Sequence, residues 1–203
     1  MQKISFYLLL LLATLSLASC SETEDEEQEF ADWQNKNELY WSNLYSKTQT
    51  LIQQGDTTWK IIPNWGIDGL TPTTGTTHTF DPKQYIIVHV LEQGKGSGCP
   101  LYTDSVRVHY QGRYIPSKTY TDGYIFDQSY SGTFSTLTAK PSVLSVSGCV
   151  EGFTTALMKM HIGDHWVVYI PYNQGYGTTT DQTSGIPGFS NLIFDLRLVG
   201  YFH

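Results

Sequence analysis

Positive charge is scarce in this 203-residue chain, which has 12 Lys and Arg residues against 19 Asp and Glu residues and a formal net charge of −7. Seven of the acidic residues lie between positions 22 and 32, where Lys and Arg are absent, so the remainder holds 12 acids and 12 bases. Nucleic-acid-binding surfaces carry a basic patch or stripe. The sequence has no such stripe, and we expect no nucleic-acid partner.

Cysteine is also scarce, with only Cys20, Cys99 and Cys149. The last two form no CxxC motif, which argues against redox catalysis. Whether they pair stays open, because a disulfide requires a Cα separation that a sequence cannot reveal. His161 and His165 have the spacing of metal ligands, but Gly163 between them is expected to end a helix and to keep them off one face. We therefore expect neither a metal nor a cofactor.

Long hydrophobic runs are absent except at the N-terminus, where residues 6–12 are apolar and follow Lys3. This run is too short to span a bilayer comfortably and is typical of an export signal. It is followed by LASC at residues 17–20, which resembles the bacterial lipobox. The resemblance implies a lipoprotein signal peptide over residues 1–20, acylation of Cys20, and a lipid anchor in the outer membrane of the cell envelope, facing the periplasm or the surface.

The acidic residues 21–30 predict a solvated tether. They also resemble the acidic signal that one group of Gram-negative bacteria uses to send lipoproteins to the cell surface. A plain repelling spacer remains the alternative.

Residues 31–82 are predicted to form an N-terminal extension. Apolar positions recur at near-helical spacing from residue 30 to 54 and include Leu39, Tyr40 or Trp41, Leu44, Leu51 and Ile52, with Gly55 as the stop. Residues 57–82 are rich in Gly, Pro and Thr, so we expect a loop-rich connector with one short strand at 59–62.

Residues 83–203 alternate between strand and turn patterns. We predict strands at residues 85–91, 105–110, 142–147, 165–170 and 192–199. A single helix is expected at 152–161, with Phe153, Leu157 and Met160 on one face and Gly163 as its C-terminal stop. This pattern favours an α+β domain in which the helix packs on one face of an antiparallel sheet.

Five segments of this domain resemble the FKBP-type peptidyl-prolyl cis–trans isomerases and occur in the family's order. They are VRVHYQG at 106–112, FDQS at 126–129, CVEGF at 149–153, IP and GYG at 170–177, and GIP followed by LIFDL at 185–196. The resemblance runs from about residue 85 to the end. It implies a twisted antiparallel sheet wrapped around one short helix, preceded here by a helical extension.

Prolyl isomerisation needs no nucleophile and no metal. The peptide bond resists rotation by about 18–20 kcal/mol because its C–N bond is partly double. Twisting removes the resonance and its charge separation, so an apolar, water-excluded slot favours the twisted state. An aromatic-lined slot with a few fixed hydrogen-bond donors is sufficient.

The resemblance assigns residues to the aromatic-lined slot and to the hydrogen-bonding groups around it. It places Asp127, Tyr110 and Phe126 in catalysis, with Asp127 orienting the Tyr110 hydroxyl or meeting the substrate amide. It places these residues in substrate binding: Cys149, Val150 through its N–H, Phe153 as the floor, Tyr176 through its hydroxyl, Ile186 on the covering loop, and Phe194 as a wall.

The sequence also departs from the family pattern. Phe153 stands where Trp is usual, Cys149 where Val is usual, and Gly188 and Phe189 follow Pro187 where a second Pro is common. Residues 116–124 form an insertion before Phe126. The usual aromatic between the FDQS segment and the helix is not evident, which leaves Phe134 or Leu144 to serve.

The expected function is isomerisation of X–Pro bonds in exported polypeptides, with proline-containing chains as partners and a macrolide as a ligand able to fill the slot. One alternative is a non-catalytic lipoprotein that binds proline peptides or acts as a chaperone. A second is an interaction lipoprotein that dimerises or docks through residues 30–82.

Overall fold

The structure, a computed structural model, describes residues 29–69, 80–181 and 183–203. The predicted signal peptide, Cys20 and the tether up to residue 28 lie outside the described residues. The chain divides by its contacts into residues 1–32 and 33–203, and the sheet and its helices belong to the second unit. Among the helices of the described ranges, none has the length and apolar character needed to cross a membrane.

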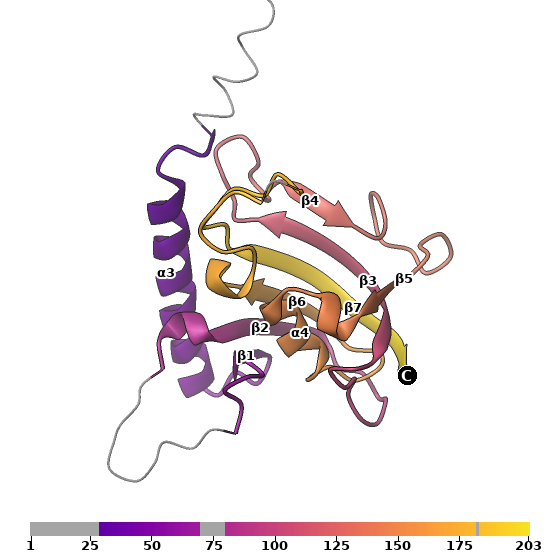
Figure 1. Cartoon of the computed structure of the whole chain (residues 1–203). Coiled ribbons are helices and arrows are strands. Elements are labelled where there is room, and N and C mark those ends of the chain that lie inside the picture. Colours follow the sequence, from indigo (N-terminus) through magenta and orange to yellow (C-terminus); the bar gives the residue numbers. More distant parts are fainter. Residues whose placement is uncertain (1–28, 70–79, 182) are drawn as a thin grey trace, which may run out of the picture. The chain divides into compact units, whose positions relative to one another are not determined.

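A seven-stranded antiparallel sheet dominates this unit (Figure 1). Its strands are β1 (Trp59–Pro63), β2 (Tyr85–Glu92), β3 (Ser105–Tyr114), β4 (Ile125–Gln128), β5 (Ser142–Ser145), β6 (His165–Ile170) and β7 (Leu192–Phe202). The spatial order is β1-β2-β6-β7-β3-β4, and β5 pairs with β3 beyond the stretch that β4 uses. The predicted α+β class is confirmed.

Helix α4 (Glu151–Leu157) packs on one face of the sheet, against β2 and β6. We call this the inner face and the opposite one the outer face. The three residues predicted to point into the core do so, since Phe153 is 4% exposed and Leu157 and Met160 are fully buried. Burial of these side chains fixes the helix on the sheet.

The helix ends earlier than predicted, at Leu157 rather than His161. The Met160 N–H divides its hydrogen bond between the carbonyls of Ala156 at 3.1 Å and Leu157 at 3.2 Å, which tightens the last turn. Gly163 has a positive φ of 94°, but it lies in the turn before β6. Its assignment as the helix stop is therefore wrong.

Helix α3 (Trp33–Gln53) is the helix predicted in the extension. Its buried residues are Trp33, Asn37, Trp41 and Thr48. The predicted apolar face is wrong in part, because Leu39 is 62% and Ile52 39% exposed. Polar side chains occupy two of the buried positions, and a hydrophobic pattern does not register them.

Strand β1 brings the extension into the sheet. It pairs with β2 along its whole length, from Trp59 opposite His89 to Pro63 opposite Tyr85. The predicted strand in the connector is thereby confirmed, and β1 shares one sheet with the strands of residues 83–203.

Strand β3 presents different side chains to the two faces, because successive residues of a strand alternate. Tyr110, Gly112 and Tyr114 point inward, whereas Gln111 and Arg113 point outward. A Cβ at Gly112 would lie 2.5 Å from Cε1 of Phe194 and 2.8 Å from Cζ of Phe126. Glycine at this position lets two aromatic rings cross the strand closely.

Candidate functional site

Four predicted aromatic residues meet on the inner face. Phe153 of α4 and Phe194 of β7 have ring centroids 4.9 Å apart, and Tyr110 of β3 lies 6.1 Å from Phe153 and 6.4 Å from Phe194. Phe126 of β4 meets Phe194 edge-on at 5.7 Å. These edge-to-face and tilted arrangements are the ones that aromatic quadrupoles favour. The four rings form an apolar cluster supplied by four different elements.

Asp127 sits beside this cluster on β4. The Tyr110 hydroxyl donates a hydrogen bond to Oδ2 of Asp127 at 2.8 Å, and the Gln128 N–H donates to Oδ1 at 2.8 Å. Burial, followed by the hydrogen bond and charge of Asp127, raises the pKa of Tyr110. The phenol therefore stays protonated and remains a donor at neutral pH. The geometry matches the orienting contact expected between these two residues.

Two hydrogen-bonding groups at the edge of the cluster have no partner in the protein. Within the described ranges, the Val150 N–H at the N-cap of α4 makes no hydrogen bond, and neither does the Tyr176 hydroxyl. Tyr176 is 38% exposed, and burial followed by the Asp127 charge raises its pKa. Both groups are free to bind a ligand carbonyl.

Cys149 adjoins Val150 at the start of the helix. Its Sγ donates to the Ser145 carbonyl at 3.3 Å, and burial raises the pKa of this thiol to about 11. The side chain is therefore a neutral, mostly apolar group at neutral pH. Cys99 and Cys149 are both free thiols.

Ile186 lies on the loop between β6 and β7 and is 1% exposed. Its carbonyl accepts a hydrogen bond from the Asp181 N–H at 2.9 Å, and the charge of Asp181 also acts on Tyr176. Ile186 is linked to the site through this segment, whereas direct ring contacts join Tyr110, Phe126, Phe153 and Phe194.

The same loop is tied to α3, a connection that the sequence did not reveal. Trp33 Nε1 donates to Ser190 Oγ at 2.8 Å, and Ser190 Oγ donates to the Pro187 carbonyl at 2.6 Å. The Asn191 N–H donates to Asn37 Oδ1 at 2.8 Å, and Asn191 Nδ2 donates to the Asn37 carbonyl at 2.7 Å. The extension thus positions the loop that carries Ile186.

Tyr114 is a further site residue that sequence reasoning missed. Its ring is 4% exposed and stacks on Phe126 at 5.1 Å, while Trp33 meets it edge-on at 6.2 Å. Strand alternation could have predicted this position, because Tyr110, Gly112 and Tyr114 share one face of a strand.

The two candidates for the missing aromatic lie on different faces. Phe134 contacts His109 at 5.0 Å and lies under the Arg197 guanidinium at 4.5 Å, which places it at the outer face and away from the slot. Leu144 pairs with the fully buried Val106 on the inner side. Of the two, only Leu144 is on the correct side of the sheet.

The fold and the cluster together define a class of protein. An antiparallel sheet holds one helix, an aromatic cluster lies between them, and two unpartnered hydrogen-bonding groups lie at its edge. Across residues 29–69, 80–181 and 183–203, no group of His, Cys, Asp and Glu has the arrangement of a metal site. The class is that of α+β domains in which one short helix packs on an antiparallel sheet over an aromatic cluster.

Comparison with known proteins gives the family. Residues 99–199 match the model of the FKBP-type peptidyl-prolyl cis-trans isomerase domain. Through this domain the chain belongs to the FKBP-type peptidyl-prolyl cis-trans isomerase family.

Curated relatives agree over the same region. The chain is 36% identical over 110 residues to the FKBP-type 22 kDa peptidyl-prolyl cis-trans isomerase of Escherichia coli, an alignment that covers 54% of this chain and 47% of that protein. It is 32% identical over 114 residues to the macrophage infectivity potentiator of Trypanosoma cruzi, covering 56% and 52%. The chain thus spans about half the length of the curated relatives it matches.

Solved structures share the fold. A peptidyl-prolyl cis-trans isomerase from Pseudomonas syringae superposes with a TM-score of 0.55 at 22% identity, covering 86% of this chain and 96% of that one. FkpA from Escherichia coli superposes with a TM-score of 0.54 at 24% identity, covering 98% and 72%. The FKBP-like fold expected from the sequence is confirmed.

Proposed function

We propose that this chain is a peptidyl-prolyl cis–trans isomerase that acts on X–Pro bonds of exported polypeptides. The observation that supports this most directly is the hydrogen bond from Tyr110 to Asp127 beside the cluster of Phe126, Phe153 and Phe194. It joins a fixed polar group to an apolar slot, which are the two parts that the reaction needs.

The slot would act by binding the twisted amide better than the planar one. A proline ring against Phe153 and Phe194 removes the bond from water, which favours the less polar twisted amide. The unpartnered Val150 N–H and the Tyr176 hydroxyl hold neighbouring carbonyls. Each 1.4 kcal/mol of such preference lowers the barrier enough for about a tenfold rate increase.

The test is turnover of a prolyl peptide in a protease-coupled assay. Phe126→Ala removes one wall and Asp127→Ala removes the acceptor of Tyr110, so each variant should lose at least about tenfold in kcat/KM. Phe134→Ala, an aromatic substitution at the outer face, is the matched control and should retain wild-type turnover. Wild-type turnover in both Phe126→Ala and Asp127→Ala would contradict the proposed site.

A second candidate is a binding module or chaperone without efficient turnover. The family usually has Trp at the position of Phe153. The smaller Phe ring reduces the floor of the pocket, and this difference favours the second function. A binder would compete with a second isomerase for a prolyl peptide and show no turnover itself. A macrolide that fills the slot should block either function, and it should lose affinity in Phe126→Ala.

We also propose that Cys20 carries the lipid anchor and that the anchor holds the protein at the outer membrane. The support is the lipobox-like sequence at residues 17–20. Labelling of cells with radioactive palmitate should mark the wild type and Cys99→Ser but not Cys20→Ser. Protease treatment of intact cells then separates a surface-facing protein from a periplasmic one.

Docking through residues 30–82 remains the third candidate. The buried side of α3 already packs within its own chain, through Trp33, Trp41 and β1. Among the described residues of this segment, exposed apolar side chains such as Leu39 and Ile52 are left for a partner. Sedimentation of the wild type and of Leu39→Ser with Ile52→Ser tests this, because a dimer held by these residues would dissociate in the double variant.

A further inference from the structure

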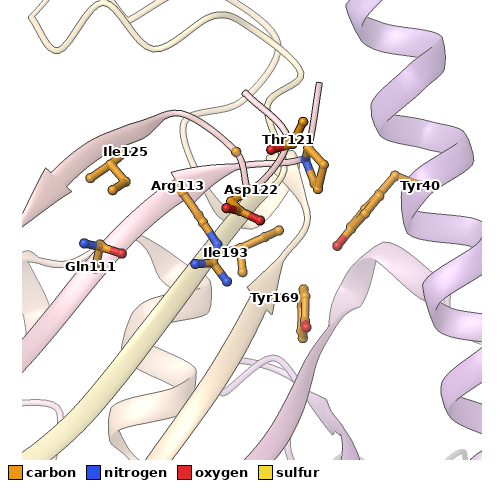
Figure 2. Close-up of a pocket in the computed structure, with 10 residues that line it drawn as sticks. Tyr40, Gln111, Arg113, Thr121, Asp122, Ile125, Tyr169 and Ile193 are labelled. Atoms are coloured by element: carbon orange, nitrogen blue, oxygen red, sulfur yellow. The ribbon is translucent and has the colours of Figure 1, made fainter. Parts of the chain in front are cut away.

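A second pocket lies on the outer face of the sheet and has no part in the aromatic slot. Its volume is about 430 Å³, within the range of small-ligand sites. Its lining residues come from α3, β3, β4, β6, β7 and the segment before β4, and Figure 2 shows the labelled ones around one space. It is lined by Tyr40, Gln111, Arg113, Pro116, Thr121, Asp122, Gly123, Ile125, Tyr169 and Ile193.

The floor is a row of residues that the strand register places side by side. Arg113 of β3 pairs with Ile125 of β4 on one side and with Ile193 of β7 on the other, and Ile193 pairs with Tyr169 of β6. Directly paired residues point to the same face of a sheet. The guanidinium of Arg113 therefore rises between two apolar neighbours, with a tyrosine next along the row.

The charge of Arg113 is not paired. Among the described residues it takes part in no ion pair within 4.0 Å and in no hydrogen bond, although its side chain is partly buried. Asp122 lines the same pocket, but among the described residues its carboxylate forms no ion pair within 4.0 Å. Partial burial of a cation without a partner lowers the stability of the folded protein. A bound anion would offset this loss by pairing with the cation.

Two hydroxyl donors accompany the guanidinium. Tyr40 reaches from α3 towards Tyr169 in Figure 2, and neither hydroxyl has a hydrogen-bond partner among the described residues. Burial, followed by the nearby Tyr169, raises the pKa of Tyr40 to about 12, and burial also raises the pKa of Tyr169. The Arg113 charge opposes both shifts. Both phenols remain protonated and can donate.

The outer wall is built by the inserted residues 116–124. The Ser117 and Gly123 N–H groups both donate to the Tyr120 carbonyl at 2.9 Å, and the Tyr114 N–H donates to the Tyr124 carbonyl at 3.0 Å. Gly123 has φ of 86°, and a Cβ there would lie 2.1 Å from the Tyr114 carbonyl oxygen. The insertion is thus held closely against β3.

We propose that this pocket binds a carboxylate attached to an apolar body, as in a free amino-acid derivative or the C-terminus of a peptide. The planar guanidinium matches a carboxylate in bidentate fashion, and the two hydroxyls complete its donors. Pro116, Ile125 and Ile193 provide the apolar contact. The negative charge of Asp122 on the same wall repels a dianion such as phosphate about twice as strongly as it repels a carboxylate with a single charge.

The test is calorimetric titration of the purified full chain with N-acetyl-phenylalanine and with its amide, which differs only in lacking the carboxylate. The acid should bind with a Kd of about 1 mM or tighter, and the amide at least about tenfold more weakly. Titration with inorganic phosphate should show no comparable binding. A peptide ending in a free Phe, compared with its amidated form, distinguishes a peptide terminus from a small molecule as the preferred source.

Variants locate the binding. Arg113→Gln should weaken the acid at least about tenfold, and Tyr169→Phe should weaken it by a smaller factor. Arg107→Gln, an exposed arginine on the same strand, is the matched control and should bind as the wild type does. Thermal melting checks that each variant is folded. If Arg113→Gln does not fold, Tyr169→Phe still tests the proposal. Equal binding of acid and amide, unchanged binding in Arg113→Gln, or no binding by the wild type would each overturn the proposal.

Discussion

Asn37 offers the sharpest test of how the extension supports the domain. Its side chain is fully buried on α3, accepts a hydrogen bond from the Asn191 N–H at 2.8 Å and donates to the Trp33 carbonyl at 2.9 Å. Substitution by Ala leaves the Asn191 N–H without an acceptor. Asn191 is itself only 2% exposed, so water cannot replace the lost partner.

The expected cost follows from these contacts. An unsatisfied buried donor costs about 1–3 kcal/mol, and Ala returns roughly 0.5 kcal/mol through its higher helix propensity. Asn37→Ala should therefore lower the free energy of unfolding by about 0.5–2.5 kcal/mol. Because Asn191 continues the loop that carries Ile186, we also expect a lower kcat/KM in the isomerase assay.

Urea unfolding of the two matched variants measures this. Asn43→Ala makes the same substitution at an exposed position of the same helix and should change stability by no more than about 0.5 kcal/mol. Equal unfolding free energies for Asn37→Ala and Asn43→Ala would refute the reasoning. The loop would then be held without the extension.

Two other perturbations have defined outcomes. Gly112→Ala places a Cβ 2.5 Å from Phe194, so we expect a loss of about 1–3 kcal/mol in urea unfolding together with reduced prolyl-peptide turnover; wild-type values in both assays would show that the rings adapt. Burial, followed by the Arg197 charge, lowers the pKa of His109 below 6.5, so the unfolded state binds more protons than the folded state just below that pH. Stability should therefore fall as pH decreases through this range, and thermal melting of His109→Gln should show a smaller fall than the wild type.

Local patterns predicted most of the fold. Local residue patterns alone predicted the helix α3, the strand β1 and the inner face of α4. The end of α4 did not follow, since a tightened last turn depends on which carbonyls the Met160 N–H meets. The buried face of α3 was also wrong in part. Asn37 is buried because it packs and hydrogen-bonds against Asn191, which lies far away in the sequence.

The site was predictable where family motifs covered it. Tyr110, Phe126, Phe153 and Phe194 lie on four segments, and only the resemblance indicated that they meet. Tyr114 follows from strand alternation once the length of β3 is known, but the predicted strand stopped at residue 110. The outer pocket was beyond sequence reasoning, because its row of Ile125, Arg113 and Ile193 depends on pairing between three strands.

The position of β7 bears on the order in which this molecule can assemble. β7 stands between β6 and β3, yet it comes after every other strand in the chain. During synthesis, β7 is the last strand to be made, and it is the strand that links β3 to β6. Until the residues from Leu192 onward are made, the sheet therefore stays in two separate parts. Its closure must come after translation of this domain, and its contacts between distant residues predict slow folding. A nascent chain halted before Leu192 would expose two unpaired strand edges at once.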